Sequence, residues 1–458
     1  MASKSNNIKY ANVFHSELWG VREVFENQPD GQKKLISGKY HSLNENNITT
    51  TKWKKLSPQT PFYLFIPQNT KLLKEYETGW IMKEIMPINV AGLYTSRDHF
   101  CIQYEKEKIW KIVKDFITLS SEDARVKYQL GKDVQDWKVN LAQKDIKQSG
   151  PDNKYLSAIL YRPFDMRWTY YTGNSRGFIC RPRSDVMRNM LKSNMAVFIG
   201  RQGQAVGTNI WDLLFCGETI EDFNLFRRGN NICFPLYLYP KSLEEAEDLL
   251  DISEAVESAG GRKPNLSPEF IEDVSERLKL SFIQDGKGNL KNTFGPEDVF
   301  HYMYGVFHSP TYRSRYAEFL KIDFPRLPLT SDIKLFRELC KVGERLKDLH
   351  LMEGEIKTIT TYPQTGDNTV DKLRYDEERE RIYINKEQYF GNVPRRVWVF
   401  HVGGYQVCSK WLKDRKGRQL SYDDLTHYQR IVASLDETID LMSNIDNIIE
   451  KNGGWPIN

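Results

Sequence analysis

Short apolar runs bounded by turn-forming residues recur along the chain and predict β-strands. These runs cover residues 8–14, 61–67, 196–200, 234–240 and 397–407. The last run contains Gly403-Gly404, which predicts two strands joined at these glycines. Between such runs, apolar residues recur every three or four positions, as on one face of a helix. This pattern predicts helices over 108–119, 296–307, 310–321, 332–352 and 421–450.

Ser267-Pro268-Glu269 adds a further helix start, because serine is a preferred N-cap and proline suits the first helical position. Strands and helices alternate without an internal repeat, which predicts an α/β fold of the mixed α+β type, in two or three lobes. The polar stretch 131–153 is a plausible boundary, and the acidic stretch 241–260 is either a solvated helix or a flexible insertion. We expect three parts, 1–150, 151–330 and 331–458.

Composition limits the class of protein more than it identifies one. The 458 residues carry a net charge of only +4, so any nucleic-acid signal must come from local clustering. The six cysteines form no C-x-x-C pair and are expected to be buried and reduced. The chain has no apolar run of membrane-spanning length and no secretory signal at its start. We therefore expect a cytoplasmic protein that does not associate with a membrane.

The motifs of several enzyme classes are absent from the sequence. It has no P-loop, no H-E-x-x-H, no Cys/His cluster and no G-x-S-x-G elbow. Neither an Asn-Pro-Pro-Tyr nor an Asp-Pro-Pro-Tyr tetrapeptide occurs, and no glycine-rich turn suits S-adenosylmethionine. The glycines of GRQGQAVG (200–207) do not fit G-x-G-x-x-G and predict a turn. We expect no catalytic residue, no metal site and no cofactor site.

The segment 161–201 carries the strongest positive signal. It contains eight basic residues against two acidic ones, with tyrosine and tryptophan interleaved. Arginine forks suit phosphate oxygens and the guanine edge, and aromatic rings stack on bases or pack on sugars. The alternative is an arginine-rich solvated surface over core aromatics. Composition alone leaves both interpretations open.

The residues of this segment also resemble a known family. YRPFDMRWTYYT (161–172) and the Arg-Pro-Arg run at 181–183 are similar to the C-terminal target-recognition region of Type ISP restriction–modification enzymes. The resemblance continues through FPLYLYP (234–240), YMYGVFHSPTYRSRYAEFLKIDFPRLPL (302–329) and VWVFHVGGYQVCSKWLKDRKGRQLS (397–421). GWIMKEIMPINVAGLYTSRDHF (79–100) resembles the chain that leaves the methyltransferase core of those enzymes.

The resemblance implies a specificity module that recognises double-stranded DNA. The family's methyltransferase, helicase and nuclease parts would then belong to a partner chain, and S-adenosylmethionine would belong to that partner. An alternative is an adenine-specific DNA methyltransferase component that is active only with a separate catalytic chain. A third possibility is a decayed fragment with an interaction role. Whatever the partner, the strands predicted at 8–14 and 61–67 would offer it an apolar docking face.

Five candidate DNA contacts lie in or directly after the basic segment. Arg181 and Arg183 flank a proline that stiffens the backbone, and Arg188 follows closely. Arg201 and Gln202 are expected at the end of the strand 196–200, where arginine reads guanine and glutamine reads adenine.

Further candidates come later in the chain. Arg313 lies on a predicted helix two residues from Arg315, so at most one of the two is expected to touch DNA. Lys410, Lys413 and Arg415 belong to a second basic cluster that could clamp phosphates or dock a partner.

Other residues are expected to have structural roles. Arg162 and Asp165 are close enough in sequence to pair with each other, beside a Pro-Phe pair typical of a core. His308, His350 and His401 are isolated in the sequence and are expected in the core or on the surface rather than in a catalytic site.

Overall fold

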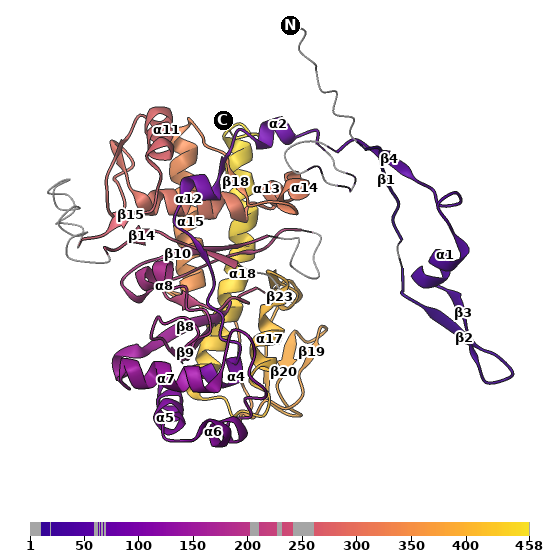
Figure 1. Cartoon of the computed structure of the whole chain (residues 1–458). Coiled ribbons are helices and arrows are strands. Elements are labelled where there is room, and N and C mark those ends of the chain that lie inside the picture. Colours follow the sequence, from indigo (N-terminus) through magenta and orange to yellow (C-terminus); the bar gives the residue numbers. More distant parts are fainter. Residues whose placement is uncertain are drawn as a thin grey trace, which may run out of the picture. The chain divides into compact units, whose positions relative to one another are not determined.

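The computed structural model describes residues 11–18, 20–58, 63, 65, 67, 70–201, 210–226, 231–240 and 261–457 (Figure 1). Contacts divide the chain into two compact units, Met1–Lys71 and Leu72–Asn458. The predictions for Gln202 and for the acidic stretch 241–260 lie outside the described residues.

The first unit is small and has no buried residue among those described. Its elements are two antiparallel strand pairs, β1–β4 and β2–β3, and one helix. They span Val13–His15 (β1), Val24–Asn27 (β2), Lys33–Ser37 (β3), Lys39–Glu45 (α1) and Lys54–Leu56 (β4). The strand predicted at 8–14 overlaps β1. The strand predicted at 61–67 is described only at Tyr63, Phe65 and Pro67, which belong to no strand.

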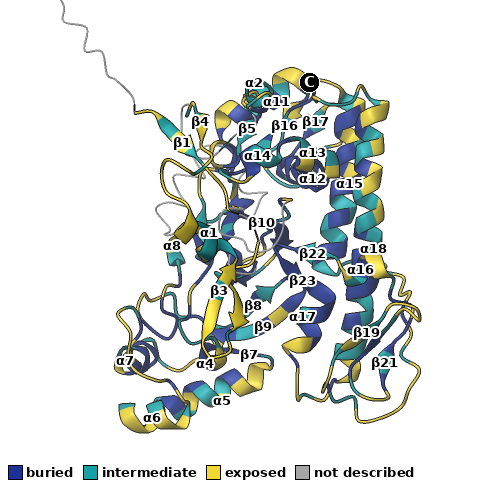
Figure 2. Ribbon diagram, turned by 90° about the vertical axis from the view of Figure 1, so that its right-hand side faces the viewer, coloured by how far each residue is buried: buried dark blue, intermediate teal, exposed yellow. Residues whose placement is uncertain are grey.

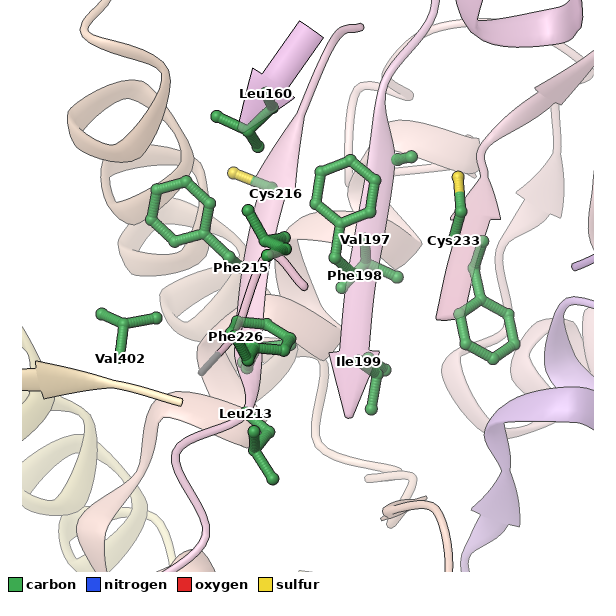
Figure 3. Packing of buried hydrophobic residues seen from close by; sticks show 14 of the residues in the cluster. Leu160, Val197, Phe198, Ile199, Leu213, Phe215, Cys216, Phe226, Cys233 and Val402 are labelled. Atoms are coloured by element: carbon green, nitrogen blue, oxygen red, sulfur yellow. The ribbon is translucent and has the colours of Figure 1, made fainter. Parts of the chain in front are cut away.

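The core of the second unit is built on an antiparallel sheet of order β11-β10-β13-β6. Its strands are Leu214–Gly217 (β11), Ala196–Gly200 (β10), Asn231–Pro235 (β13) and Val90–Ala91 (β6). All five residues of β10 are buried, as expected for an apolar central strand. Figure 3 shows Val197, Phe198 and Ile199 beside the side chains of β11 and β13. This sheet confirms the strand predicted at 196–200.

A second sheet carries the basic aromatic segment. Its order is β12-β8-β9-β7, in which β8 and β9 form an antiparallel hairpin and β12 runs parallel to β8. The strands are Ile220–Glu221 (β12), Leu156–Arg162 (β8), Asp165–Tyr170 (β9) and Ile102–Gln103 (β7). The hairpin has a turn end at residues 163–164 and an open end at residues 156 and 170.

Long helices pack beside these sheets in the second unit. They are Pro296–His308 (α12), Ile333–Leu351 (α15) and Tyr422–Lys451 (α18), and Figure 2 shows their buried faces. A Cβ placed on Gly343 of α15 would lie 1.8 Å from the carbonyl oxygen of His301 in α12, so only glycine permits this close crossing. The predicted helices at 296–307, 332–352 and 421–450 are confirmed, the last as a single helix.

The other helices are short and mostly cap or connect strands. They are Leu73–Tyr76 (α2), Met82–Ile85 (α3), Asp98–Cys101 (α4), Lys106–Phe116 (α5), Ser121–Lys127 (α6), Val139–Ser149 (α7), Asn153–Tyr155 (η1), Ser184–Met187 (α8), Arg188–Leu191 (η2), Pro268–Leu278 (α11), Pro310–Arg315 (α13), Ala317–Leu320 (α14), Arg395–Trp398 (α16) and Val407–Lys413 (α17). The predicted start at Ser267-Pro268 is confirmed, and the region 310–321 divides into α13 and α14.

Four two-stranded sheets and one three-stranded sheet, β19-β20-β21, complete the described part of the second unit. They are formed by Trp80–Ile81 (β5), Tyr237–Leu238 (β14), Lys263–Pro264 (β15), Ser281–Phe282 (β16), Thr293–Phe294 (β17), Arg326–Leu327 (β18), Arg374–Asp376 (β19), Arg381–Tyr383 (β20), Tyr389–Phe390 (β21), His401–Val402 (β22) and Tyr405–Gln406 (β23). Gly403 and Gly404 join β22 to β23 with positive φ angles, as their sequence predicted. The first residues of the run predicted at 397–407 lie in α16 rather than in a strand.

Segments from all three sequence-predicted parts share one apolar core. For example, β6 pairs with β13, β7 pairs with β9, and α15 packs on β11. The three-part division at 150 and 330 stays a prediction. All six cysteines are buried free thiols, as predicted. Within the described residues, every helix is too short or too polar to cross a membrane.

Candidate nucleic-acid interface

The turn end of the β8–β9 hairpin is organised around the buried carboxylate of Asp165. Its oxygens accept hydrogen bonds from Nη2 of Arg167 at 2.7 Å and Nη2 of Arg415 at 2.9 Å. Burial alone would raise the pKa of Asp165, but the two guanidinium groups outweigh burial and hold that pKa below its ordinary value. This ion-pair cluster joins β9 to the loop after α17.

A second buried carboxylate, Asp222, pairs with Arg162 at 2.7 Å. Burial raises the pKa of Asp222 to about 6, although Arg162 opposes the shift. The predicted pair between Arg162 and Asp165 is therefore wrong. The hairpin turn places Arg162 toward the residues after β12, and Asp165 instead bonds Arg167 and Arg415.

The rings of Tyr161 and Tyr104 stack on arginine guanidinium groups at this end of the hairpin. Arg162 and Arg167 lie 3.8 and 3.9 Å from the ring centroid of Tyr161. Tyr104 contacts Arg167 at 4.2 Å and Arg418 at 4.0 Å. Such stacking restricts each arginine and keeps its positive charge at a fixed position.

Two adjoining hollows open at this turn end. The first hollow has a volume of about 430 Å³ and is lined by Tyr161, Arg162, Arg167, Asn224, Tyr405, Lys410 and Asp414. The second hollow measures about 1040 Å³, and its charged lining residues are Arg97, Asp98, Lys108, Arg167 and Arg418. Together they are lined by six basic and two acidic side chains. Arg162, Arg167 and Arg418 are paired with Asp222, Asp165 and Glu105, so the positive charge without an ion-pair partner among the described residues belongs to Lys410, Lys108 and Arg97.

A third hollow of about 830 Å³ lies at the open end of the same hairpin. Its lining includes Ser157 and Ala158 of β8 and Tyr171 and Thr172 after β9. Its charged residues are Lys154, Arg188, Lys192 and Glu218. The hairpin therefore separates two hollows with six cations from one hollow with three.

The predicted contacts in the basic segment lie in different surroundings. Arg181 is exposed and pairs with Asp136. Arg183 is half-buried with a left-handed φ of 58° just before α8. Arg188 lines the third hollow and donates from Nη1 to the carbonyl oxygen of Pro240 at 3.1 Å. Arg201 is exposed at the end of β10, the position that its sequence predicted.

Two later candidates are buried, which corrects the sequence interpretation. Arg313 is 6% exposed in α13 and donates from Nε to the carbonyl oxygen of Phe307 at 2.8 Å. Burial lowers the pKa of Arg313 to about 10. Arg415 is 5% exposed and is paired with Asp165. Neither guanidinium is free to reach a phosphate, because each is enclosed by the core of the fold.

The two remaining candidates, Lys410 and Lys413, are accessible at the surface. Lys410 lines the first hollow, and Lys413 is exposed at the end of α17. His308 and His350 are buried, and they are not isolated in space. The rings of His308 and His350 lie 5.3 Å apart, and burial lowers the pKa of each.

Sequence reasoning missed Tyr104, Asn224 and Arg418 as lining residues. Arg418 continues the basic cluster that begins at Lys410, so extending that cluster by a few residues would have included it. Tyr104 and Asn224 stand in no basic segment. Tyr104 follows β7 and reaches the hollows because β7 pairs with β9. Asn224 follows β12 and reaches them because β12 pairs with β8.

Residues 84–444 match the family described as the Type ISP C-terminal specificity domain. The chain belongs to this family. The match spans most of the second unit and includes every residue that lines the three hollows. No curated protein matches the sequence.

Three solved structures share the fold of this chain. A nuclease-deletion mutant of the Type ISP enzyme LlaGI, in complex with a DNA substrate mimic, has a TM-score of 0.57 at 18% identity and covers 87% of this chain. The ATP-dependent Type ISP enzyme LlaBIII bound to DNA has a TM-score of 0.60 at 18% identity and covers 86%. The DrdV–DNA complex has a TM-score of 0.64 at 14% identity and covers 88%. The matches span only 31%, 25% and 41% of those longer chains.

Proposed function

We propose that this chain is a sequence-specific double-stranded DNA recognition module of a Type ISP restriction–modification system. The observation that carries the proposal is the pair of adjoining hollows at the turn end of the β8–β9 hairpin, within the specificity-domain family match. Lys410, Lys108 and Arg97 line them without an ion pair to another described residue, and such cations can neutralise phosphates and release counterions. The solved structures of similar fold are two Type ISP enzymes and DrdV, each in complex with DNA or a DNA substrate mimic.

Lys410 and Lys108 are the phosphate contacts we assign in the two hollows. Lys108 is exposed, Lys410 is partly exposed, and neither makes an ion pair with another described residue. Lys413 lies beyond Lys410 on the same helix and extends this basic surface. Among the arginines of the basic segment, Arg201 is the strongest candidate for base readout because its side chain is exposed at a strand end. Arg181, Arg183 and Arg188 stay candidates for either kind of contact.

A selection from a randomised duplex library, followed by titration over a salt series, tests this function. We expect an enriched sequence, and an affinity that falls steeply as salt rises because several cations displace counterions. Arg201→Ala should weaken binding to the selected duplex by about 1–3 kcal/mol and random duplex by less, if the side chain contacts a base. A chain that enriches no sequence and binds random duplex equally well would contradict the proposal.

We further propose that the catalytic parts and S-adenosylmethionine belong to a separate partner chain. The support is that the sequence contains neither a Pro-Pro-Tyr methyltransferase tetrapeptide nor a glycine-rich turn suited to S-adenosylmethionine. Calorimetry should then give no saturable binding of S-adenosylmethionine to the purified chain. Stoichiometric binding would overturn this assignment. The six reduced cysteines support a cytoplasmic location.

A further inference from the structure

The loop after β12 stands between the two turn-end hollows. Tyr161, Arg167 and Asn224 line both hollows, so these three residues form the partition that separates them. If phosphates occupy the basic hollows on either side, a base edge of the same duplex faces this partition. The polar groups on the partition therefore decide which base is tolerated there.

The side chains of two of the three partition residues already make hydrogen bonds within the fold. Arg167 donates from Nε and Nη2 to Asp165, at 3.1 and 2.7 Å. The hydroxyl of Tyr161 donates to Asp98 at 3.2 Å. The side-chain amide of Asn224, in contrast, makes no hydrogen bond with any other described residue, and the residue is half-buried.

The backbone of Asn224 is held rigidly. Its N–H donates to Oδ1 of Asp222 at 2.9 Å, and the same Oδ1 accepts from Arg162 at 2.7 Å. On the far side, Leu225 and Phe226 are fully buried. Figure 3 shows Phe226 among buried apolar side chains, close to Leu213.

Two glycines allow the neighbouring chain to approach this loop closely. A Cβ on Gly92 would lie 2.8 Å from the Cα of Phe223, and a Cβ on Gly403 would lie 2.4 Å from the ring of Phe226. The N–H of Phe223 also donates to the carbonyl oxygen of Leu93 at 2.8 Å. Packing and hydrogen bonds therefore hold the backbone of this loop, which places the Asn224 side chain at the partition.

We infer that Asn224 is a specificity-determining residue that reads adenine in the major groove, an inference that rests on the proposed function. An asparagine amide both donates and accepts, which matches the N6 amino group and N7 of adenine. The arrangement divides the work: Lys410 and Lys108 position the duplex through phosphates, and Asn224 discriminates the base at the partition.

The test starts from the DNA sequence selected by the parent chain. Asn224→Ala should lose preference at one adenine position, by about 5–150-fold, and keep the preferences elsewhere. Asn224→Asp removes the donor and keeps the size, so it should shift that position toward cytosine, whose N4 amino group donates. Asn444→Asp makes the same chemical change at an exposed site on α18 that lines none of the three hollows, and it should leave the selected sequence unchanged.

Replacing that adenine by 7-deaza-adenine provides a second readout. The analogue lacks the N7 acceptor, so it should lower the affinity of the parent chain for the duplex and leave the affinity of Asn224→Ala unchanged. Equal weakening of both proteins would overturn the inference, as would an Asn224→Ala variant that keeps the full parental preference. A parent chain that selects no sequence at all would instead contradict the proposed function, so the two failures are distinguishable.

Discussion

The two ends of the β8–β9 hairpin use the same residue types for different purposes. At the turn end, Arg162 and Arg167 are stacked on Tyr161 and paired with buried carboxylates. At the open end, Lys192 is exposed and lines a hollow beside Arg188. The comparison shows that the arginines held by both a tyrosine ring and a buried carboxylate have structural roles in the fold. They line the turn-end hollows as ion-paired side chains, whereas Lys410, Lys108 and Lys192 line their hollows without an ion pair to another described residue.

The largest expected effect comes from removing the carboxylate at the turn end. Asp165→Ala leaves Arg167 and Arg415 buried without their shared partner, which should lower the free energy of unfolding by about 3–5 kcal/mol. Urea denaturation measures this loss. Asp440→Ala is the matched control, because it removes a carboxylate from an exposed ion pair with Arg396, and it should cost less than about 1 kcal/mol. Equal costs for the two variants would contradict the central role of Asp165.

The second effect depends on pH through Asp222. Its folded pKa of about 6 lies above its ordinary value of 3.8, so between these pH values the folded chain holds more protons than the unfolded chain. This contribution to stability is fully present below about pH 4 and is lost as pH rises through 6. Relative to Asp222→Asn, the parent should therefore lose up to about 3 kcal/mol of unfolding free energy between pH 4 and 7.

Urea denaturation of both proteins at several pH values gives this difference. Glu221 is also buried with a raised pKa, chiefly because of burial, and the charge of Asp222 adds to that shift. The comparison therefore measures the titration of Asp222 together with its coupling to Glu221. A difference between the two proteins that is independent of pH would show that Asp222 is ionised throughout the range.

A smaller effect is expected on DNA affinity at the turn end. Lys410→Ala should weaken binding to every duplex by about 1 kcal/mol and reduce the slope of log affinity against log salt by about one, because one phosphate contact is lost. A shift assay over a salt series measures both. Lys386→Ala removes an exposed lysine that lines none of the hollows and should leave the slope unchanged.

The smallest effect is expected at the open end. Lys192→Ala removes a cation from the third hollow, which has half as many basic residues as the turn-end pair. We expect the affinity for DNA to change by less than about twofold in the same assay. A loss larger than that of Lys410→Ala would reverse the comparison and move the DNA interface to the open end.

Much of the local structure was determined by the sequence itself. The Gly403-Gly404 pair predicted the β22–β23 hairpin, because only glycine adopts two successive positive φ angles readily. Ser267-Pro268 predicted the start of α11, and the apolar period over 332–352 predicted α15. The ordered motifs from 161 to 421 also led to the family that the comparison of residues 84–444 establishes.

Only the tertiary structure decided which charges are available. Arg415 and Lys413 are two residues apart, yet one is buried against Asp165 and the other is exposed. Asp165 lies 250 residues from Arg415, and Asn224 reaches the hollows only through the pairing of β12 with β8. The spacing of apolar residues indicates whether a segment is a helix or a strand and which of its faces is buried. Burial of a charged side chain and its ion pairs depend instead on residues that the fold brings together from distant positions. For this reason the sequence indicated a basic segment, and the fold decided which of its side chains are buried in ion pairs and which are exposed.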